Sequence, residues 1–248
     1  MNEHFNSDVE DIQAASLNGS VVRDRGPYGI LLGDDRLHFD PVVIQEPAPT
    51  GREILEAGGK VPAVDYALFR LLFDGLFEPV GFEEVTDLRT HGVEKFLAFN
   101  TSVLYRFELN AQGFEWGATC ISGRTLKQLA QVDATTHDVF EVRGGEERVV
   151  EDRDLVDLAK PGLERFVTRP IDIVIFVNTR ERHVHQRRLD YWQVVHLAFP
   201  DAKPDPKVLY TVTYSRGPHQ NPEGKLEPTQ FVWVKERMVF SVTPTDQS

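Results

Sequence analysis

The chain has 248 residues, of which 41% are hydrophobic and 27% charged, and its formal net charge is −12. This composition is that of a folded protein, and its acidity argues against binding nucleic acid or an anionic membrane. The single cysteine, Cys120, excludes an intrachain disulfide framework and disfavours a cysteine zinc site. No apolar run is long enough to span a bilayer and no signal peptide is visible, so we expect a cytoplasmic protein.

The first structural unit is expected to follow a polar N-terminal tail. Residues 1–27 are polar and predict a flexible segment. Two strands are then predicted within residues 28–44, joined by a Gly-Asp-Asp turn. Thr50 predicts the N-cap of a helix, and Gly58-Gly59 predicts its C-terminal cap, because glycine accepts a left-handed backbone. Strands within residues 66–99 close this unit.

The second unit repeats the same order of elements. Ser122 predicts the N-cap of a helix that runs to Ala130, with Leu126 and Leu129 on its buried face. The predicted strands of this unit are residues 104–109, 114–116, 138–142 and 163–167.

The third unit has a longer loop. Asp190 predicts a helix N-cap, and Pro200 predicts where the helix stops. Residues 215–228 are polar and rich in glycine and proline, and predict an irregular loop. Residues 231–234 and 238–242 predict a closing hairpin. The other predicted strands are residues 173–177, 183–186 and 208–214.

An internal repeat supports this division. The pattern of residues 87–96, Asp-Leu, three residues, Gly, an aliphatic residue, Glu, a basic residue and Phe, recurs at residues 157–166, 70 positions later. Thr50-Gly51-Arg52 recurs as Ser122-Gly123-Arg124. A period of about 70 residues suits a very small domain.

The order strand, strand, helix, strand, strand is that of a β-grasp. We therefore predict an α+β chain of three tandem β-grasp, ubiquitin-like domains with a polar N-terminal tail. The predicted boundaries are 1–27 for the tail, 28–100 for the first domain, 101–169 for the second, and 170–248 for the third with its C-terminal tail.

These motifs resemble the bacterial multiubiquitin-domain family. The resemblance rests on the Asp-Leu block, the Thr/Ser-Gly-Arg helix start and the closing segment 234–243, and covers roughly residues 28–248. It implies domains encoded beside ubiquitin-activating, conjugating and JAB-type deconjugating enzymes, with a role in anti-phage defence. The chain departs from the family where members often carry an Asp-Gly turn before the last strand, because Glu236-Arg237 stands there.

The resemblance implies a protein modifier whose carboxyl end is joined to a target. The last strand is expected to end near Val242, which would leave residues 243–248 as a projecting tail. We take Thr245, Asp246, Gln247 and Ser248 as the candidate conjugation residues. Arg143-Gly144-Gly145 resembles the tail of ubiquitin, but it lies between predicted strands and is interpreted as a hairpin turn.

A self-assembling scaffold or filament is the alternative function. A basic stretch contains Arg180, Arg182, Arg187 and Arg188 in an otherwise acidic chain. These arginines are the candidate docking or self-association residues, with another copy of the chain or a pathway enzyme as the partner.

Enzyme chemistry has no supporting set of residues, so we expect neither a catalytic site nor a cofactor. Cys120 has no histidine nearby in sequence and is interpreted as structural. His183 and His185 share a strand face, but they lack an apparent third ligand and have basic neighbours, so a metal site is not expected.

Overall fold

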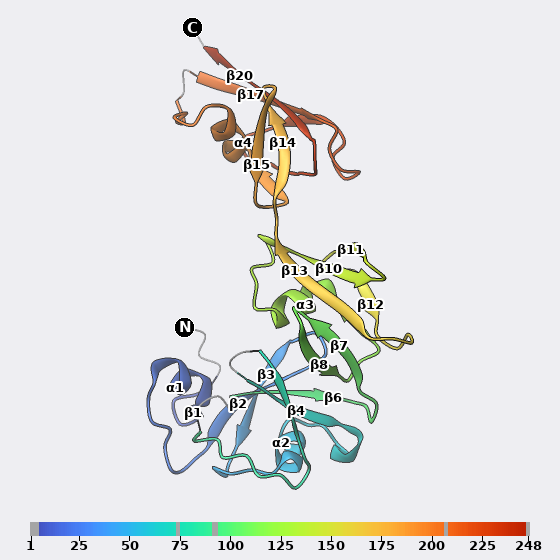
Figure 1. The fold of residues 1–248 in the computed structure, drawn as a ribbon. Helices are drawn as coiled ribbons and strands as arrows, with labels where there is room; N and C mark the ends of the chain where they lie inside the picture. Colours follow the sequence, from blue (N-terminus) through green and yellow to red (C-terminus); the bar gives the residue numbers. More distant parts are fainter. Residues whose placement is uncertain (1–4, 73–74, 91–93, 206–207, 247–248) are drawn as a thin grey trace. The chain divides into compact units, whose positions relative to one another are not determined.

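The computed structural model of the chain describes residues 5–72, 75–90, 94–205 and 208–246. The chain divides into two compact units (Figure 1). The first consists of Met1–Val132 and Val139–Thr168, and the second of Asp133–Asp138 and Arg169–Ser248. Two large sheets lie in the first unit and one lies in the second.

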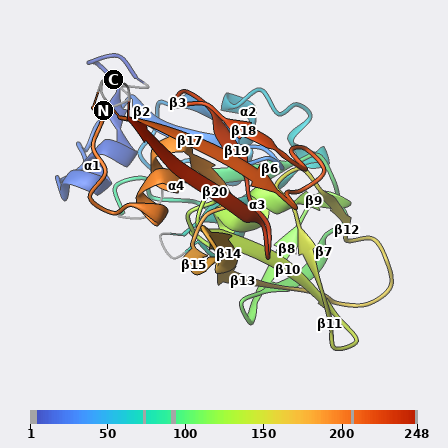
Figure 2. The same ribbon diagram turned by 90° about the horizontal axis from the view of Figure 1, so that it is seen from above.

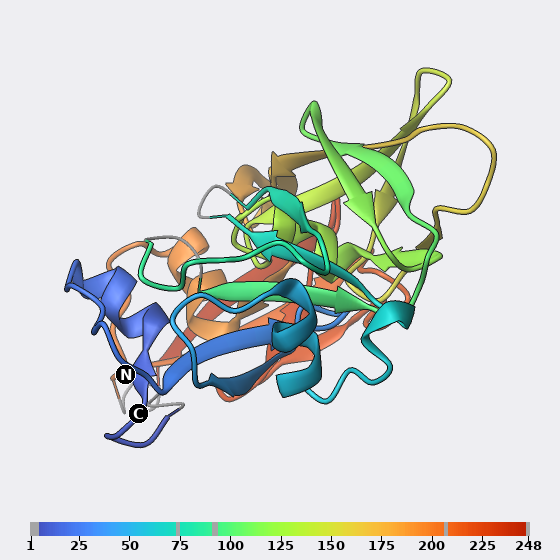
Figure 3. The ribbon, with the colours of Figure 1, turned by 90° about the horizontal axis from the view of Figure 1, so that it is seen from below.

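The first sheet has β2 at its centre. Strand β2 pairs antiparallel with β3 and parallel with β6, and β4 pairs antiparallel with β6 and β5. Helix α2 (cyan) packs near the β2–β3 hairpin, as Figure 3 shows from below. The elements are β1 (Glu10–Asp11), α1 (Ile12–Asn18), β2 (Tyr28–Gly33), β3 (Phe39–Ile44), α2 (Gly51–Ala57), the 3-10 turn η1 (Ala63–Asp65), β4 (Ala67–Leu71), β5 (Phe77–Val80) and β6 (Lys95–Phe99).

Within the segment 1–27 that was predicted as a tail, residues 10–18 form β1 and α1. Asp11 caps α1 by accepting a hydrogen bond from the backbone N–H of Ala14, and Ile12 is buried in the first core. Strand β1 runs parallel to the start of β2, at Tyr28 and Gly29. Strand β3 pairs along all of β2, whereas β6 pairs only from Leu31 onward, so β1 occupies the part of the second edge that β6 leaves open. Among residues 5–27 the buried hydrophobic residues are Ile12, Ala15 and Val22, and so few core residues leave a composition close to that of a flexible tail.

The second sheet has the strand order β8-β7-β13-β10-β11, with β9 and β12 forming a small separate ladder. The first strand, β7, is again parallel to the last, β13. The elements are β7 (Tyr105–Leu109), β8 (Gln112–Trp116), β9 (Cys120–Ser122), α3 (Gly123–Leu129), β10 (His137–Arg143), β11 (Glu146–Val150), β12 (Leu155–Asp157) and β13 (Glu164–Pro170).

The third sheet has the order β15-β14-β20-β17-β18, and β16 pairs with β19 in a small ladder. The long strands β17 and β20 lie side by side, as the view from above shows (Figure 2). The elements are β14 (Ile173–Val177), β15 (Arg180–Val184), β16 (Arg188–Asp190), α4 (Tyr191–Ala198), β17 (Val208–Ser215), β18 (Gly224–Leu226), β19 (Phe231–Trp233) and β20 (Val239–Asp246).

The three sheets share one topology. Each has an N-terminal hairpin, a short helix, a further pair of strands, and a last strand inserted parallel to the first. This is the β-grasp arrangement, and the chain contains three such domains in tandem.

The repeated Thr/Ser-Gly-Arg sequence builds the helix start in two domains. Thr50 and Ser122 each accept a hydrogen bond from the backbone N–H three residues later. A side-chain carbon at Gly51 would lie 2.4 Å from the carbonyl oxygen of Gly81, and one at Gly123 would lie 2.2 Å from that of Glu151. Only glycine permits this close approach of two backbones.

The repeated Asp-Leu block anchors the segment before the last strand. Asp87 accepts a hydrogen bond from the backbone N–H of Arg89, and Asp157 accepts one from Ala159. The following leucines, Leu88 and Leu158, are buried at 0% and 4% exposure. The sequence repeat therefore records an Asx turn that directs a leucine into each core.

The first two domains share a hydrophobic core. Phe69 and Phe99, on the face of the first sheet opposite its own helix, belong to the same cluster as Phe107 and Trp116 of the second domain. The ring centroids of Phe99 and Trp116 are 4.9 Å apart in an edge-to-face arrangement. The second domain thus covers the outer face of the first sheet.

Two predicted features of the third domain are wrong. Strand β19 pairs with β16 rather than forming a hairpin with β20, and β20 lies between β14 and β17. The segment 215–228 contains β18, which pairs with β17, instead of being wholly irregular. The alternation of apolar and polar residues predicts that a segment is a strand, but it does not show whether the strand pairs with the next one in sequence or with a distant one.

Candidate functional site

The last strand of the third domain extends four residues beyond its predicted end. Strand β20 pairs antiparallel with β17 from Val239 through Asp246, whereas the expected end was Val242. Among the candidate conjugation residues, Thr245 lies in this strand opposite Leu209, and the backbone of Asp246 lies opposite Val208. Gln247 and Ser248 lie outside the described residues.

An asparagine side chain holds β20 at Val242. Asn178 follows β14 in a left-handed conformation, with φ of 49°. Its amide donates to the carbonyl of Val242 at 2.9 Å and accepts from the N–H of Val242 at 2.8 Å. It thereby replaces a ladder partner at the point where β14 ends. In the second domain Asn110 likewise accepts from the N–H of Thr168, at 2.8 Å, but its amide donates to the Thr168 hydroxyl instead of to the carbonyl.

The outer face of β17 and β20 is uncharged. Tyr210, Val212 and Tyr214 of β17 and Phe240 and Val242 of β20 pack in the core, so the alternating residues face outward. We call these outward residues the threonine strip. Its members are Leu209, Thr211, Thr213, Ser241, Thr243 and Thr245.

The corresponding faces of the other two domains are different. The first is covered by the second domain through the shared aromatic core. On the second, Arg165 of β13, the strand that corresponds to β20, forms an exposed ion pair with Glu108 of β7 at 2.9 Å. An uncharged outer face that leads to the end of the last strand is therefore a property of the third domain. The sequence signal for it was the alternation of Thr and Ser in residues 209–213 and 241–245.

The four candidate docking arginines have different environments. Arg182 donates to the carbonyl of Leu197 at the end of α4, at 2.9 Å. Arg187 makes two hydrogen bonds to the Asp138 carboxylate, at 2.9 and 2.6 Å. Neither Arg180 nor Arg188 has an ion pair with any residue that the structure describes. The structure thus engages Arg182 and Arg187 in hydrogen bonds within the unit, and Arg188 stacks on the ring of Phe231.

His183 and His185 each form a hydrogen bond with an oxygen atom of their own unit. His183 Nδ1 lies 2.8 Å from Asp172 Oδ1, and His185 Nδ1 lies 3.1 Å from the carbonyl oxygen of Ile171. The hydrogen bond that the His183 ring donates to the Asp172 carboxylate raises the pKa of His183 above its usual value. Within residues 5–72, 75–90, 94–205 and 208–246, no group of three His, Cys, Asp or Glu side chains could hold a metal ion.

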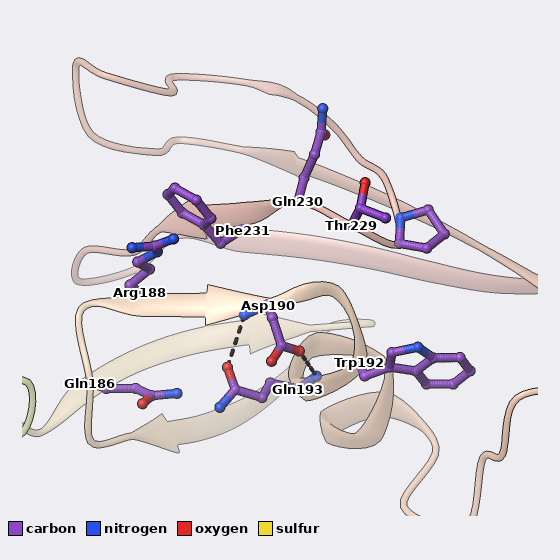
Figure 4. Close-up of a pocket in the computed structure, with 9 residues that line it drawn as sticks. Gln186, Arg188, Asp190, Trp192, Gln193, Thr229, Gln230 and Phe231 are labelled. Atoms are coloured by element: carbon purple, nitrogen blue, oxygen red, sulfur yellow. Dashed lines mark hydrogen bonds between the residues drawn. The ribbon is translucent and has the colours of Figure 1, made fainter.

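A pocket lies beside the β16–β19 ladder and the start of α4, with a volume of about 420 Å³. The Arg188 guanidinium lies 3.0 Å from the ring centroid of Phe231. Figure 4 shows these two side chains at one end and Trp192 at the other. Asp190 and Gln193, between them, are joined by the reciprocal hydrogen bonds of a capping box. Sequence reasoning did not identify this pocket, because it needs the β16–β19 pairing.

Exposed aromatic side chains extend from this pocket. Phe231 and Trp233 remain 47% and 43% exposed. Strand β19 is nevertheless fixed on both edges, by β16 and by the side chain of Asn221, which bonds both the N–H and the carbonyl of Trp233. Two exposed rings on a rigid strand are a typical contact surface for another protein.

The topology and its threefold repetition define a tandem ubiquitin-like protein. The sequence model of the Multiubiquitin family matches the chain three times, over residues 36–101, 105–171 and 173–246. The three matches cover most of the chain, so the chain belongs to the Multiubiquitin family. No curated protein matches it. In the part of the chain that the structure describes, no helix is long and apolar enough to cross a membrane.

Proposed function

We propose that this protein is a ubiquitin-like modifier, joined to its targets through the carboxyl end that follows β20. Cognate activating and conjugating enzymes perform the joining, and a JAB-type metallopeptidase reverses it or trims the end. Anti-phage defence is the process in which we place this pathway. Family membership supports the ubiquitin-like role, and the chain's own chemistry supports a carrier rather than a catalyst.

The observation that carries this proposal is the position of the threonine strip. An activating enzyme must hold the folded domain while the carboxyl end enters its nucleotide site. The strip offers an uncharged surface on β20, which leads to that end, and on its neighbour β17, in a chain of which 27% is charged. Burying threonine and serine hydroxyls at an interface costs less than burying charges.

The test is an activation reaction with the neighbouring activating enzyme and ATP, followed by mass spectrometry. We expect an adenylate or thioester at the carboxyl end, and none after deletion of residues 245–248. Thr213→Glu should lower adduct formation by about tenfold or more, because it buries an unpaired charge at the proposed interface. Gln112→Glu adds the same charge to an exposed position of the second domain and should have little effect. An intact chain that forms no adduct, even after treatment with the neighbouring peptidase, contradicts the proposal.

A self-assembling scaffold is the second candidate, and the exposed aromatic rings of β19 favour it. Phe231 and Trp233 could be covered by another copy of the chain. Sedimentation at micromolar concentration should then show an oligomer that Trp233→Ser dissociates. A monomer at both low and high salt contradicts this alternative.

A further inference from the structure

We propose that β20 consists of a fixed half, Val239–Val242, and a releasable half, Thr243–Asp246, and that release of the second half from β17 makes the carboxyl end accessible. This inference rests on the proposed function for its purpose, and on the pairing of β20 for its mechanism. The boundary lies at Val242.

The fixed half is held on both edges. Phe240 pairs with β14 and its carbonyl accepts from the N–H of Asn178 at 3.0 Å, and the side chain of Asn178 holds Val242. On the other edge the same residues pair with β17. Met238, Phe240 and Val242 are also buried in the core, at 0%, 1% and 3% exposure. Opening this half would therefore break two ladders and expose core side chains.

The releasable half is held on one edge only. After Val242, no described strand or side chain hydrogen-bonds to β20 on the side of β14. The alternation of backbone groups directs the N–H and carbonyl of residues 240 and 242 toward β14, so position 244 also faces that open edge. Pro244 stands there and has no N–H to offer. The open edge consequently lacks a donor and pairs poorly with another strand.

The sheet is also narrow at this end. Strand β18 pairs with β17 only at Val212–Tyr214, so the segments 208–211 and 243–246 form a ribbon of two strands. A two-stranded ribbon is marginally stable in water. Thr243, Pro244 and Thr245 are exposed, and none of them belongs to the core cluster.

The two strands of this ribbon are not anchored equally. Tyr210 of β17 packs against Trp192 and Phe199, and its carbonyl accepts a hydrogen bond from the Tyr191 hydroxyl at 2.5 Å. The opposite residue is the exposed Pro244. When the ribbon opens, β17 therefore stays on α4 and the half of β20 that departs is the one that leads to the carboxyl end.

Amide hydrogen exchange on the full chain tests this division directly. The N–H groups of Ser241, Thr243 and Thr245 all face β17, so they differ mainly in which half contains them. We expect Thr243 and Thr245 to exchange at least about tenfold faster than Ser241, through local opening rather than global unfolding. Equal protection of the three amides overturns the inference, whatever the activating enzyme does.

A disulfide lock tests its role in activation. In a Cys120→Ser background, Leu209→Cys with Thr245→Cys joins directly opposed residues of the releasable half. Ser215→Cys with Val239→Cys is the matched control, since it joins an equally opposed pair in the fixed half and lies outside the threonine strip. We expect the oxidised lock to abolish adduct formation and reduction to restore it, while the oxidised control remains active. Full activity of the oxidised lock overturns the role of release. Absence of adducts from every reduced form contradicts the proposed function instead, and the exchange experiment still decides whether β20 divides at Val242.

Discussion

At the scale of single residues, the asparagine that follows the first strand of the second and third domains holds the last strand at the point where the first strand ends. Asn110 and Asn178 occupy equivalent positions with φ of 52° and 49°, a conformation that asparagine tolerates better than most residues. In the first domain the equivalent position is Gly33, which has no side chain to offer. The last strand of that domain is instead covered by the second domain.

Asn178→Ala should destabilise the second unit by about 1–3 kcal/mol, because it removes two hydrogen bonds and strains the left-handed backbone. Asn178→Asp is the matched control, since it keeps the shape and the acceptor for the Val242 N–H but loses the donor. We expect Asp to give an intermediate loss. Chemical denaturation measures the stability, and faster exchange of the Val242 amide should accompany the loss. An unchanged denaturation midpoint for Asn178→Ala would show that the hydrogen bonds between the Asn178 side chain and Val242 contribute nothing to stability.

His183 should make the stability of the second unit slightly dependent on pH. Its pKa is raised because Asp172 accepts a hydrogen bond from the ring and carries a negative charge. Protonated His183 therefore stabilises the folded unit. Because the pKa is higher in the folded state, this stabilisation is fully present below the unfolded pKa of about 6.5 and is lost as pH rises through the folded pKa. The side chain is 54% exposed, so the effect on stability should be small. NMR titration should find the raised pKa, and Asp172→Asn should return it toward the ordinary value.

At the scale of elements, prolines occupy sheet edges that could otherwise pair with another chain. Pro41 lies in β3 and Pro79 in β5, the two outer strands of the first sheet. Leu31, opposite Pro41, directs its N–H to the carbonyl of Glu94 on the other side of β2. The antiparallel ladder therefore leaves the backbone of Pro41 facing the open edge, where an N–H is missing.

Pro41→Thr together with Pro79→Thr should increase self-association, because each change restores an N–H and a strand-forming side chain to an edge. Light scattering at increasing protein concentration measures it, with the unaltered chain as reference. Pro228→Thr, in a loop outside every strand, should not associate and serves as the matched control. If the double variant stays as dispersed as the parent, these prolines do not protect the edges.

The elements that could be predicted from the sequence were those determined by residues close together in the chain. Thr50, Ser122 and Asp190 cap the three predicted helices through their own side chains, and Gly144 and Gly145 adopt the positive φ of a hairpin turn. What failed depended on distant partners. Strand β19 finds β16 rather than β20, and β20 continues past Val242 because β17 is long enough to pair with it. The threonine strip likewise exists only once those two strands are neighbours.

At the scale of the whole molecule, the sequence indicated three domains, two from the repeated motifs and the third from its order of elements, but it could not show that two of them share a core. Phe69 and Phe99 alternate with residues of the first core, so each reads locally as an outward residue of a half-buried strand. Phe99 packs edge-to-face against Trp116 of the second domain, and Phe69 packs against Phe99 in the same cluster, so their burial depends on the second domain. Three sequence repeats are thus two compact units.

Phe99→Ala should therefore destabilise the first two domains together. Phe99 is 3% exposed, lies edge-to-face with Trp116, and is 5.8 Å from Phe69 between ring centroids. Removing a buried phenylalanine costs about 3–5 kcal/mol, and here the cavity opens between the two domains. We expect the amides of β4 and β6 to lose protection against hydrogen exchange in parallel with those of β7 and β8.

Phe240→Ala removes an equally buried ring from the core of the third domain, at 1% exposure, and is the matched control. It should lower protection in β14 and β17 while leaving β4, β6, β7 and β8 unchanged, because its contacts lie within the second unit. Loss of protection confined to the first domain in Phe99→Ala would mean that the shared aromatic cluster does not couple the two folds. Parallel loss of protection in the first and second domains would mean that the two depend on the shared aromatic cluster. Cleavage between them would then expose this cluster, so a processing peptidase could not release the first domain as a stable modifier of its own.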